Sequence, residues 1–191
     1  MNVYRTSLDG VLLIEPHVFM DSRGIFLETY QQKRYEEAGI GVGKPFVQDN
    51  HSHSVRGALR GLHYQLLHPQ GKLVWVVCGT IFDVAVDIRR NSPTFGKWLG
   101  IHLSAGDHRQ IFIPEGFAHG FCVLSEQADV IYKCTDFYVP GDEYGIRWDD
   151  PDLAIGWPVR NPILSEKDAH HPFLSQQREE CFPLLKNGCS G

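Results

Sequence analysis

A histidine, a lysine and a tyrosine in this chain could together move a proton off and back onto a carbon atom. His63 lies in a run of glycine, arginine and apolar residues (57–65), Lys72 follows a Gln-Gly turn, and Tyr132 lies in a later strand-like run. A neutral imidazole can accept a proton near pH 7, an ammonium group can stabilise the resulting oxyanion, and a phenol can return a proton. These residue types predict proton abstraction next to a carbonyl, without a cofactor.

Each of the three residues also has an ordinary structural interpretation. A lone histidine can be hydrogen-bonded inside a core, a lysine beside a turn can be solvated, and a tyrosine on the inner face of a strand is usually part of the core. Arg60 and Lys72 near His63 favour a functional role for that histidine. For Tyr132, the residue pattern alone decides little.

Asp168 is the candidate that orients and charge-balances His63, as a carboxylate does for other catalytic bases. The run Ser165-Glu166-Lys167-Asp168 also has nearly the spacing of a capping box. Asp168 could therefore stand at the third position of a helix start instead. Spacing leaves both roles open, and the two are compatible.

Arg23 and Arg60 are candidate contacts for a pyrophosphate, because a guanidinium fork suits phosphate oxygens; an exposed structural arginine is the alternative for both. Strict strand alternation would put Arg60 and His63 on opposite faces. We expect a bulge at the intervening Gly61 to restore a common face.

Two amides indicate a further ligand contact. Gln48 and Asn50 alternate onto one face of their strand, with Asp49 on the other. Inward amides need hydrogen-bond partners, which a ligand could supply.

A metal site is the main competing interpretation of His63, since many metal-binding β-barrels use a His-x-His pair. Here the pair is broken, because Gln65 stands at its second position, and Lys72 would repel a cation. We therefore expect no metal. His51 and His53 do form a His-x-His pair, but without a matching third ligand, and we expect solvent exposure there.

The elements around these residues are predicted to be mostly strands. Residues 81–89 alternate Phe82, Val84, Val86 and Ile88 against polar neighbours, which predicts a half-buried antiparallel strand. Turn signals separate further strands, expected at 11–14, 25–30, 46–50, 58–65, 73–78, 98–103, 110–113, 120–124 and 129–135. Short helices are expected at 31–38, ended by Gly39, and from about Ser165.

Composition indicates one globular domain in 191 residues, 42% of them hydrophobic and 21% charged. We expect a domain over 1–175 and a loosely held tail over 176–191. A net charge of -5 argues against a nucleic-acid binder. The five cysteines are scattered, which favours a reducing compartment, although a bridge between Cys181 and Cys189 is possible. With no signal peptide and no long apolar run, we expect a cytoplasmic protein without membrane association.

The chain resembles the dTDP-4-dehydrorhamnose 3,5-epimerase family over roughly residues 5–172. The similar segments are long and ordered: 23–28, 46–50, 60–63, 70–74, 82–87, 92–96, 113–121 and 164–168. The resemblance implies a mainly β, cupin-like jelly-roll barrel of antiparallel strands with a few short peripheral helices. It also implies a homodimer, no metal and no cofactor.

The resemblance also implies residue roles. His63 would take the C3 and C5 protons, Asp168 would orient it, Lys72 would stabilise the enolate, and Tyr132 would return the proton from the opposite face. Tyr138 would stack on the nucleotide base. The substrate-binding residues would be Arg23, Phe26, Glu28, Gln48, Asp49, Asn50, Arg60, Lys72, His119, Tyr138, Glu143 and Lys167.

The implied reaction is epimerisation of dTDP-4-dehydro-6-deoxy-D-glucose at C3 and C5 to dTDP-4-dehydro-L-rhamnose. One alternative is a single-carbon epimerase or keto-isomerase acting on a dTDP-4-keto-6-deoxy sugar, because such relatives share most of these motifs. Another is a non-catalytic or metal-dependent cupin. The Tyr132 match favours the double epimerase.

Overall fold

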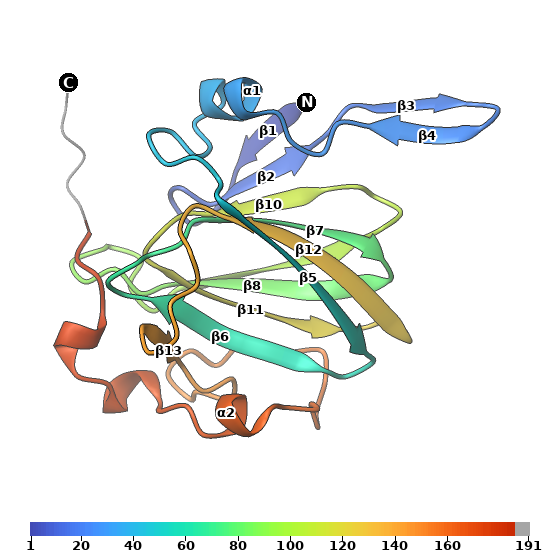
Figure 1. The fold of residues 1–191 in the computed structure, drawn as a ribbon. Coiled ribbons are helices and arrows are strands. Elements are labelled where there is room, and N and C mark those ends of the chain that lie inside the picture. Colours follow the sequence, from blue (N-terminus) through green and yellow to red (C-terminus); the bar gives the residue numbers. More distant parts are fainter. Residues whose placement is uncertain (186–191) are drawn as a thin grey trace.

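The structure, a computed structural model, describes residues 1–185. Strands dominate these residues, with two short α-helices and two 3-10 turns (Figure 1). The strands are β1 (Asn2–Arg5), β2 (Leu12–Glu15), β3 (Val18–Asp21), β4 (Gly24–Leu27), β5 (Gln48–Val55), β6 (Leu59–Gln65), β7 (Lys72–Cys78), β8 (Thr80–Asp87), β9 (Trp98–Ser104), β10 (Gln110–Ile113), β11 (Phe117–Val123), β12 (Gln127–Cys134) and β13 (Glu143–Gly145). The helices are α1 (Gln32–Glu37) and α2 (Glu166–Ala169), and the turns are η1 (Leu174–Gln176) and η2 (Glu179–Cys181).

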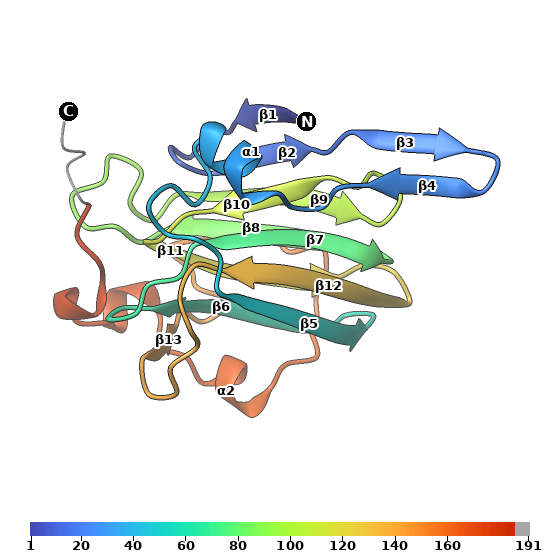
Figure 2. The same ribbon diagram turned by 45° about the horizontal axis from the view of Figure 1, so that its top comes forward.

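Two antiparallel sheets face each other and form the body of the molecule. The larger has the order β1-β2-β10-β7-β12-β5 and the smaller the order β13-β6-β11-β8-β9. The hairpin of β3 and β4 forms a sheet of its own and projects away from the body in two views (Figures 1 and 2). The predicted mainly β, cupin-like fold of antiparallel strands with few short helices is confirmed.

The main core lies between the two sheets. Val74 and Val130 from the larger sheet pack in one buried cluster with Ala85 and Phe121 from the smaller sheet. These side chains are almost fully buried, and each large apolar side chain contributes about 1.5–3 kcal/mol by leaving water. This core holds the two sheets at a defined separation.

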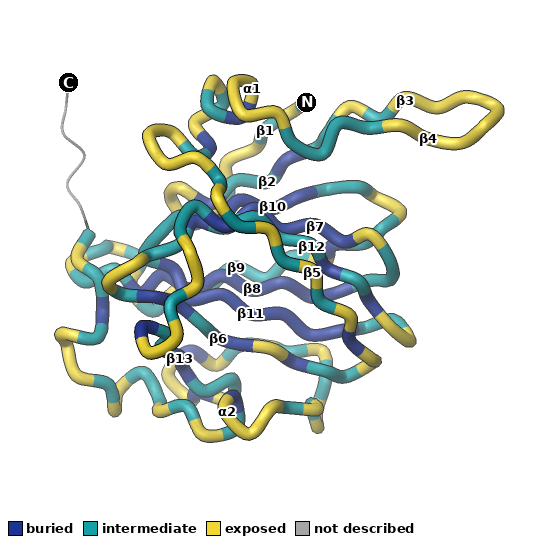
Figure 3. The backbone as a smooth tube through the Cα atoms, viewed as in Figure 1, coloured by how far each residue is buried: buried dark blue, intermediate teal, exposed yellow. Residues whose placement is uncertain are grey.

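The prediction that residues 81–89 form a half-buried strand is wrong, because β8 is buried on both faces (Figure 3). The Phe82 face is covered by a second apolar cluster that includes Leu153 and Phe182 from the C-terminal part of the chain. On the other face, Asp83 and Asp87 are fully buried and hydrogen-bonded to neighbouring side chains. The alternation of apolar and polar residues identifies the two faces of β8 correctly. It does not reveal whether water or protein covers the polar face.

Other strand predictions are confirmed with shifts at their ends, and several short strands were not predicted. β5 runs on through His51, Ser52 and His53 to Val55, five residues beyond its predicted end at position 50. It forms one edge of the larger sheet, and nearly all its side chains are polar, so no hydrophobic alternation marks it. The strands without a prediction are β1, β3 and β13.

Helix α1 confirms the helix expected at 31–38. The Gln31 side chain caps it by accepting a hydrogen bond from the Arg34 backbone N–H (2.6 Å). Gly39 follows at φ +85°, the left-handed conformation that commonly ends helices. Tyr35 anchors the helix by donating to Gln110 Oε1 (2.8 Å), and burial raises the pKa of its phenol to about 12.

The C-terminal segment is packed through residue 185 and not loosely held as expected from Gln176 onward. The Tyr64 hydroxyl donates to Gln177 Oε1 (2.8 Å), and the Leu185 backbone N–H donates to the Arg90 carbonyl (3.0 Å). The domain boundary at 175 stays a prediction. Cys181 is a free thiol, and its possible partner Cys189 lies outside the described residues. Among residues 1–185, no helix has the length and apolar character needed to cross a membrane.

Candidate active site

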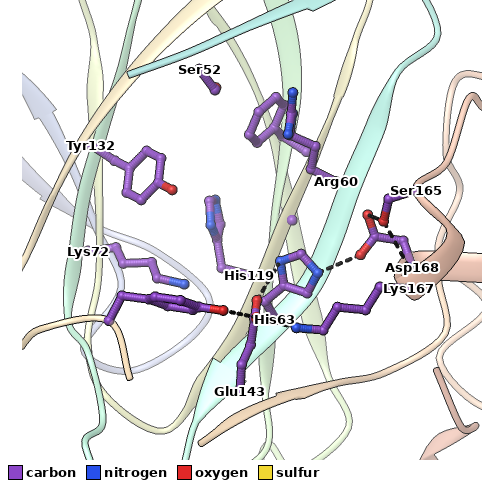
Figure 4. Close-up of a pocket in the computed structure, with 13 residues that line it drawn as sticks. Ser52, Arg60, His63, Lys72, His119, Tyr132, Glu143, Ser165, Lys167 and Asp168 are labelled. Carbon is purple, nitrogen blue, oxygen red and sulfur yellow. Dashed lines mark hydrogen bonds and ion pairs between the residues drawn. The ribbon is translucent and has the colours of Figure 1, made fainter. Parts of the chain in front are cut away.

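A cavity of about 290 Å³ opens between the two sheets, and both sheets supply polar side chains to it (Figure 4). Lys72 and Tyr132 come from β7 and β12 of the larger sheet. His63 and His119 come from β6 and β11 of the smaller one. The other labelled residues around this cavity are Ser52, Arg60, Glu143, Ser165, Lys167 and Asp168.

A bulge in β6 places Arg60 and His63 on the same side of the strand. On the neighbouring β11, His119 pairs with His63 and Phe121 with Arg60, so one residue of β11 opposes two residues of β6. Gly61 adopts φ +108° at this point. A Cβ there would lie 2.5 Å from the His119 carbonyl oxygen, closer than real contacts allow. The predicted bulge and common face are confirmed.

His63 is held by a carboxylate from α2. Its Nε2 lies 2.5 Å from Asp168 Oδ1. Burial alone raises the pKa of the Asp168 carboxyl, but the nearby His171 ring and the hydrogen bonds from His63 and Ser165 outweigh it and hold that pKa well below its usual range. The carboxylate is therefore the acceptor, and Nε2 carries the proton. His63 Nδ1 is left with the lone pair that can accept a proton.

Asp168 combines both roles that its spacing had left open. Ser165 caps α2, since its Oγ accepts from the Asp168 backbone N–H (3.1 Å), and its hydroxyl donates to Asp168 Oδ2 (2.8 Å). The helix start thus fixes the carboxylate whose other oxygen faces His63.

A second carboxylate, Glu143 of β13, lies on the other side of His63. Its Oε1 is 3.6 Å from His63 Nδ1, and its Oε2 accepts from the Tyr138 hydroxyl (2.9 Å) and from Lys167. Burial raises the pKa of Glu143, but the Lys167 hydrogen bond and the nearby His63 produce a net lowering. Two ionised carboxylates therefore flank the His63 ring.

Lys72 and Tyr132 reach into the cavity from the opposite sheet (Figure 4). Burial lowers the pKa of Lys72, and the nearby Cys134, Glu143 and Asp83 counteract part of that shift. Burial raises the pKa of the Tyr132 phenol, which keeps it protonated and able to donate. Both were placed in the cavity by sequence prediction, and the structure brings them together with His63.

His119 also lines the cavity. Its Nε2 is 2.9 Å from Asp83 Oδ2, and both side chains are nearly inaccessible to solvent. Asp83 on β8 was not predicted as a site residue. It holds one nitrogen of His119, so the ring has a defined orientation toward the ligand space.

The remaining predicted residues fall into three groups. Arg60, Tyr138, Glu143 and Lys167 line the cavity. Gln48 and Asn50 lie on the inward face of β5, where Gln48 donates to Asn50 Oδ1 (3.0 Å) and accepts from the Tyr138 backbone N–H (2.8 Å). Outside the cavity lie Asp49, which pairs with Lys133, Glu28, which pairs with Arg34, and Arg23 and Phe26, which lie on the β3–β4 hairpin.

His171 is the functional candidate that sequence reasoning missed. Its ring lies edge-on to His63, with 5.5 Å between centroids, and its Nε2 is 3.6 Å from Asp168 Oδ1. The i, i+3 spacing from Asp168 is a local sign of this contact, but the room for the ring comes from Gly145 on a distant strand. Ser52 was also missed; its buried Oγ lines the cavity and makes no hydrogen bond within residues 1–185.

His63, Asp168 and His171 also place three potential metal ligands within 4.8 Å of one another. His171, and not the residue at position 65, is thus the second histidine of this cluster. In this structure the short His63–Asp168 hydrogen bond occupies the space between those two groups. The predicted His51–His53 exposure is confirmed, and both rings contact Asp129 Oδ1, at 2.8 and 3.0 Å.

The family model described as dTDP-4-dehydrorhamnose 3,5-epimerase matches residues 5–176. The chain belongs to this family. A dTDP-4-dehydrorhamnose 3,5-epimerase from Shigella flexneri is 59% identical over 169 residues, which cover 88% of this chain and 93% of that protein. The resemblance inferred from the motifs is confirmed.

Two further relatives of the dTDP-4-dehydrorhamnose 3,5-epimerase family bear on the substrate. The crystal structure of a dTDP-6-deoxy-D-glucose-3,5-epimerase from Legionella pneumophila, in complex with dTDP-4-keto-L-rhamnose, superimposes with a TM-score of 0.94 at 51% identity, covering 97% of this chain and 99% of that one. A dTDP-4-dehydrorhamnose 3-epimerase from Streptomyces niveus is 40% identical over 182 residues, covering 94% of this chain and 86% of that protein.

Proposed function

We propose that the chain epimerises dTDP-4-dehydro-6-deoxy-D-glucose at C3 and C5 to dTDP-4-dehydro-L-rhamnose. One observation carries this proposal: His63 and Tyr132 enter one cavity from facing sheets, with Lys72 beside Tyr132. Inverting a carbon next to a ketone needs a base on one side, an acid on the other, and a positive charge for the oxyanion.

Each inversion then proceeds through an enolate. His63 Nδ1 takes the proton from the carbon next to the C4 ketone, and the electrons of that C–H bond move to the C4 oxygen. The Lys72 ammonium stabilises the negative oxygen. The Tyr132 hydroxyl returns a proton to the opposite face of the carbon, and exchange with solvent restores both side chains before the second carbon reacts.

The nucleotide half of the substrate is assigned to the polar side chains at the cavity rim. Arg60 presents a guanidinium whose Nε donates to Ser54 Oγ (3.0 Å), which fixes its direction while leaving donors for phosphate oxygens. Tyr138 is half-exposed and offers a ring face for the base to stack on. Gln48 and Asn50 supply amides on the same side.

A single-carbon epimerase is the second candidate. The 3-epimerase from Streptomyces niveus has 40% identity to this chain, so the family fold serves both outcomes. The arrangement of His63 and Tyr132 supports inversion, whereas the number of carbons inverted depends on how the sugar turns between steps.

Turnover in heavy water tests the proposal. We expect deuterium at both C3 and C5 of the product, detected by proton NMR, because each position is reprotonated from solvent. His63→Ala should abolish incorporation at both carbons, while the exposed His51→Ala serves as the matched control and should leave it unchanged. Deuterium at one carbon only would establish the single-carbon alternative, and incorporation by His63→Ala would refute the base assignment.

The working unit is proposed to be a homodimer in which the β3–β4 hairpin reaches the partner's cavity. This accounts for the position of Arg23 and Phe26, predicted ligand contacts that lie outside the cavity of their own chain. The expected absence of a metal, a cofactor and a nucleic-acid partner stays a prediction, as do the single domain over 1–175 and the cytoplasmic location.

A further inference from the structure

A second imidazole lies against the carboxylate that holds His63. His171 follows α2, and 9% of its side chain is exposed. Its Nε2 is fully buried and makes no hydrogen bond within residues 1–185. Asp168 Oδ1, the same oxygen that binds His63, lies 3.6 Å from it. A buried ring nitrogen without a hydrogen-bond partner lowers the stability of the folded state. We therefore expect the His171 N–H to have a role.

The fold makes room for this ring at one defined place. Gly145 of β13 is the direct strand partner of His63 on β6. A Cβ at Gly145 would lie 2.3 Å from the Cε1 and Nε2 atoms of His171. Because Gly145 has no side chain, the His171 ring can fill the space beside His63. Pro172, which directly follows His171, is anchored to the strand region, because its carbonyl accepts from the Arg147 backbone N–H (3.0 Å).

We propose that His171 is a positioning residue, whose Nε2–H is directed at Asp168 Oδ1 and, together with Ser165, fixes that carboxylate against His63. Ser165 holds Oδ2 with its hydroxyl (2.8 Å), so the two oxygens are restrained from different sides. The proposal rests on the proposed function, in which His63 is the base. His171 is not among the residues that line the cavity, so it acts through Asp168 and not on the sugar.

Two variants of nearly equal size separate this role from simple space filling. His171→Met keeps the volume but removes the N–H donor, whereas His171→Gln keeps a donor near the Nε2 position. We expect His171→Met to lower kcat about tenfold, an effect typical of residues that orient a functional side chain, with KM changed less than twofold. His171→Gln should stay within about threefold of the wild-type kcat.

A spectroscopic measurement reports on the same contact without turnover. The proton between His63 Nε2 and Asp168, at a donor–acceptor distance of 2.5 Å, should give a far-downfield proton NMR signal. We expect this signal to weaken or move upfield in His171→Met and to persist in His171→Gln. If wild-type protein shows the signal but no epimerase activity, the proposed function fails while the positioning contact stands.

Gly145→Ala displaces the His171 ring without changing His171. We expect it to lower kcat as His171→Met does, and to have no further effect in a His171→Ala background, where no ring remains to be displaced. Equal kcat values for His171→Met and His171→Gln, or additive effects of the Gly145→Ala and His171→Ala changes, would overturn the proposal.

Discussion

Lys72 is the residue whose charge state matters most for the proposed enolate. Lys72 is half-buried and lines a cavity with His63 and Tyr132. Burial disfavours the charged form, so the protein keeps a positive charge there at some cost. That cost is recovered only when a negative oxygen forms beside it, which is the condition for stabilising a transition state more than the substrate.

Replacing Lys72 by Met should lower kcat/KM by about 10²–10³-fold, the loss expected when one oxyanion-stabilising group is removed. Lys133→Met is the matched control, because Lys133 lies one position from Tyr132 but pairs with Asp49 outside the cavity. The control should keep nearly full activity. Comparable losses in both variants, measured by steady-state kinetics, would argue that charge at position 72 has no special role.

The pH dependence follows from the lowered pKa of Lys72. The ammonium is present below that pKa and is lost as pH rises through it, so kcat/KM should fall at a pH below the ordinary lysine value of about 10.4. Tyr132 does not cause this decline, because burial raises its pKa. Lys72→Arg, which stays charged, should remove the alkaline decline in a kcat/KM profile. An unchanged decline in that variant would contradict the assignment.

At the level of single residues, the sequence predicts which side chains can transfer protons, but not every contact that positions them. His63, Lys72 and Tyr132 were predicted from residue type and from the family motifs, and they do share a cavity. His171 was missed because its contact with Asp168 depends on the space left by Gly145. That space arises from strand pairing between distant segments, which no local motif encodes.

The bulge in β6 is the element that aligns the site, and a glycine pair makes it possible. A Cβ at Gly61 would lie 2.6 Å from the Gly120 Cα, and a Cβ at Gly120 would lie 2.6 Å from the Arg60 carbonyl oxygen. The strands can approach this closely only without side chains. Arg60 and His63 share a face as a direct result.

Gly61→Ala should therefore destabilise the protein by about 2 kcal/mol more than Gly57→Ala, through overpacking against β11. Gly57 is a matched control, because it also has a positive φ, +80°, but a Cβ there meets no atom within 4 Å. Urea unfolding curves measure the difference. Equal free energies of unfolding for the two variants would show that the close approach is not limiting.

Element prediction succeeded where apolar side chains mark a strand and failed in the polar part of β5. The bulge was predicted because two functional residues required a common face. The continuation of β5 was missed because its inward residues, including Ser52 and Ser54, are polar as well as its outward ones. The two-sided burial of β8 depends on Phe182 and other C-terminal residues folding back over it, a long-range contact outside any local pattern.

At the scale of the whole molecule, the β3–β4 hairpin is an exposed apolar arm. Phe19, Met20, Ile25 and Phe26 are 57%, 80%, 47% and 70% exposed, and the two strands pair only with each other. An isolated two-stranded hairpin is marginally stable in water, and an exposed apolar patch of this kind marks an interaction surface. A partner subunit would cover it.

We expect Phe26→Asp to weaken the proposed homodimer and to reduce activity in parallel, because a charge on the arm opposes burial. Leu67→Asp is the control, since Leu67 is 76% exposed but lies in the loop between β6 and β7 and not on the hairpin. Sedimentation velocity and activity across a dilution series measure both effects. A Phe26→Asp protein that remains dimeric and active would exclude the arm from the interface.

Tyr132 and His63 lie on separate sheets, so the distance between them depends on how the core between the sheets is packed. Ala85 and Phe121 on one sheet pack against Val74 and Val130 on the other, and this core separates the proposed proton donor from the proposed proton acceptor. A bulkier side chain at Ala85 would push the two sheets apart and increase the distance between Tyr132 and His63, across which the sugar ring must lie. A buried residue such as Ala85, which does not line the cavity, would thus contribute to which centres of the sugar are inverted.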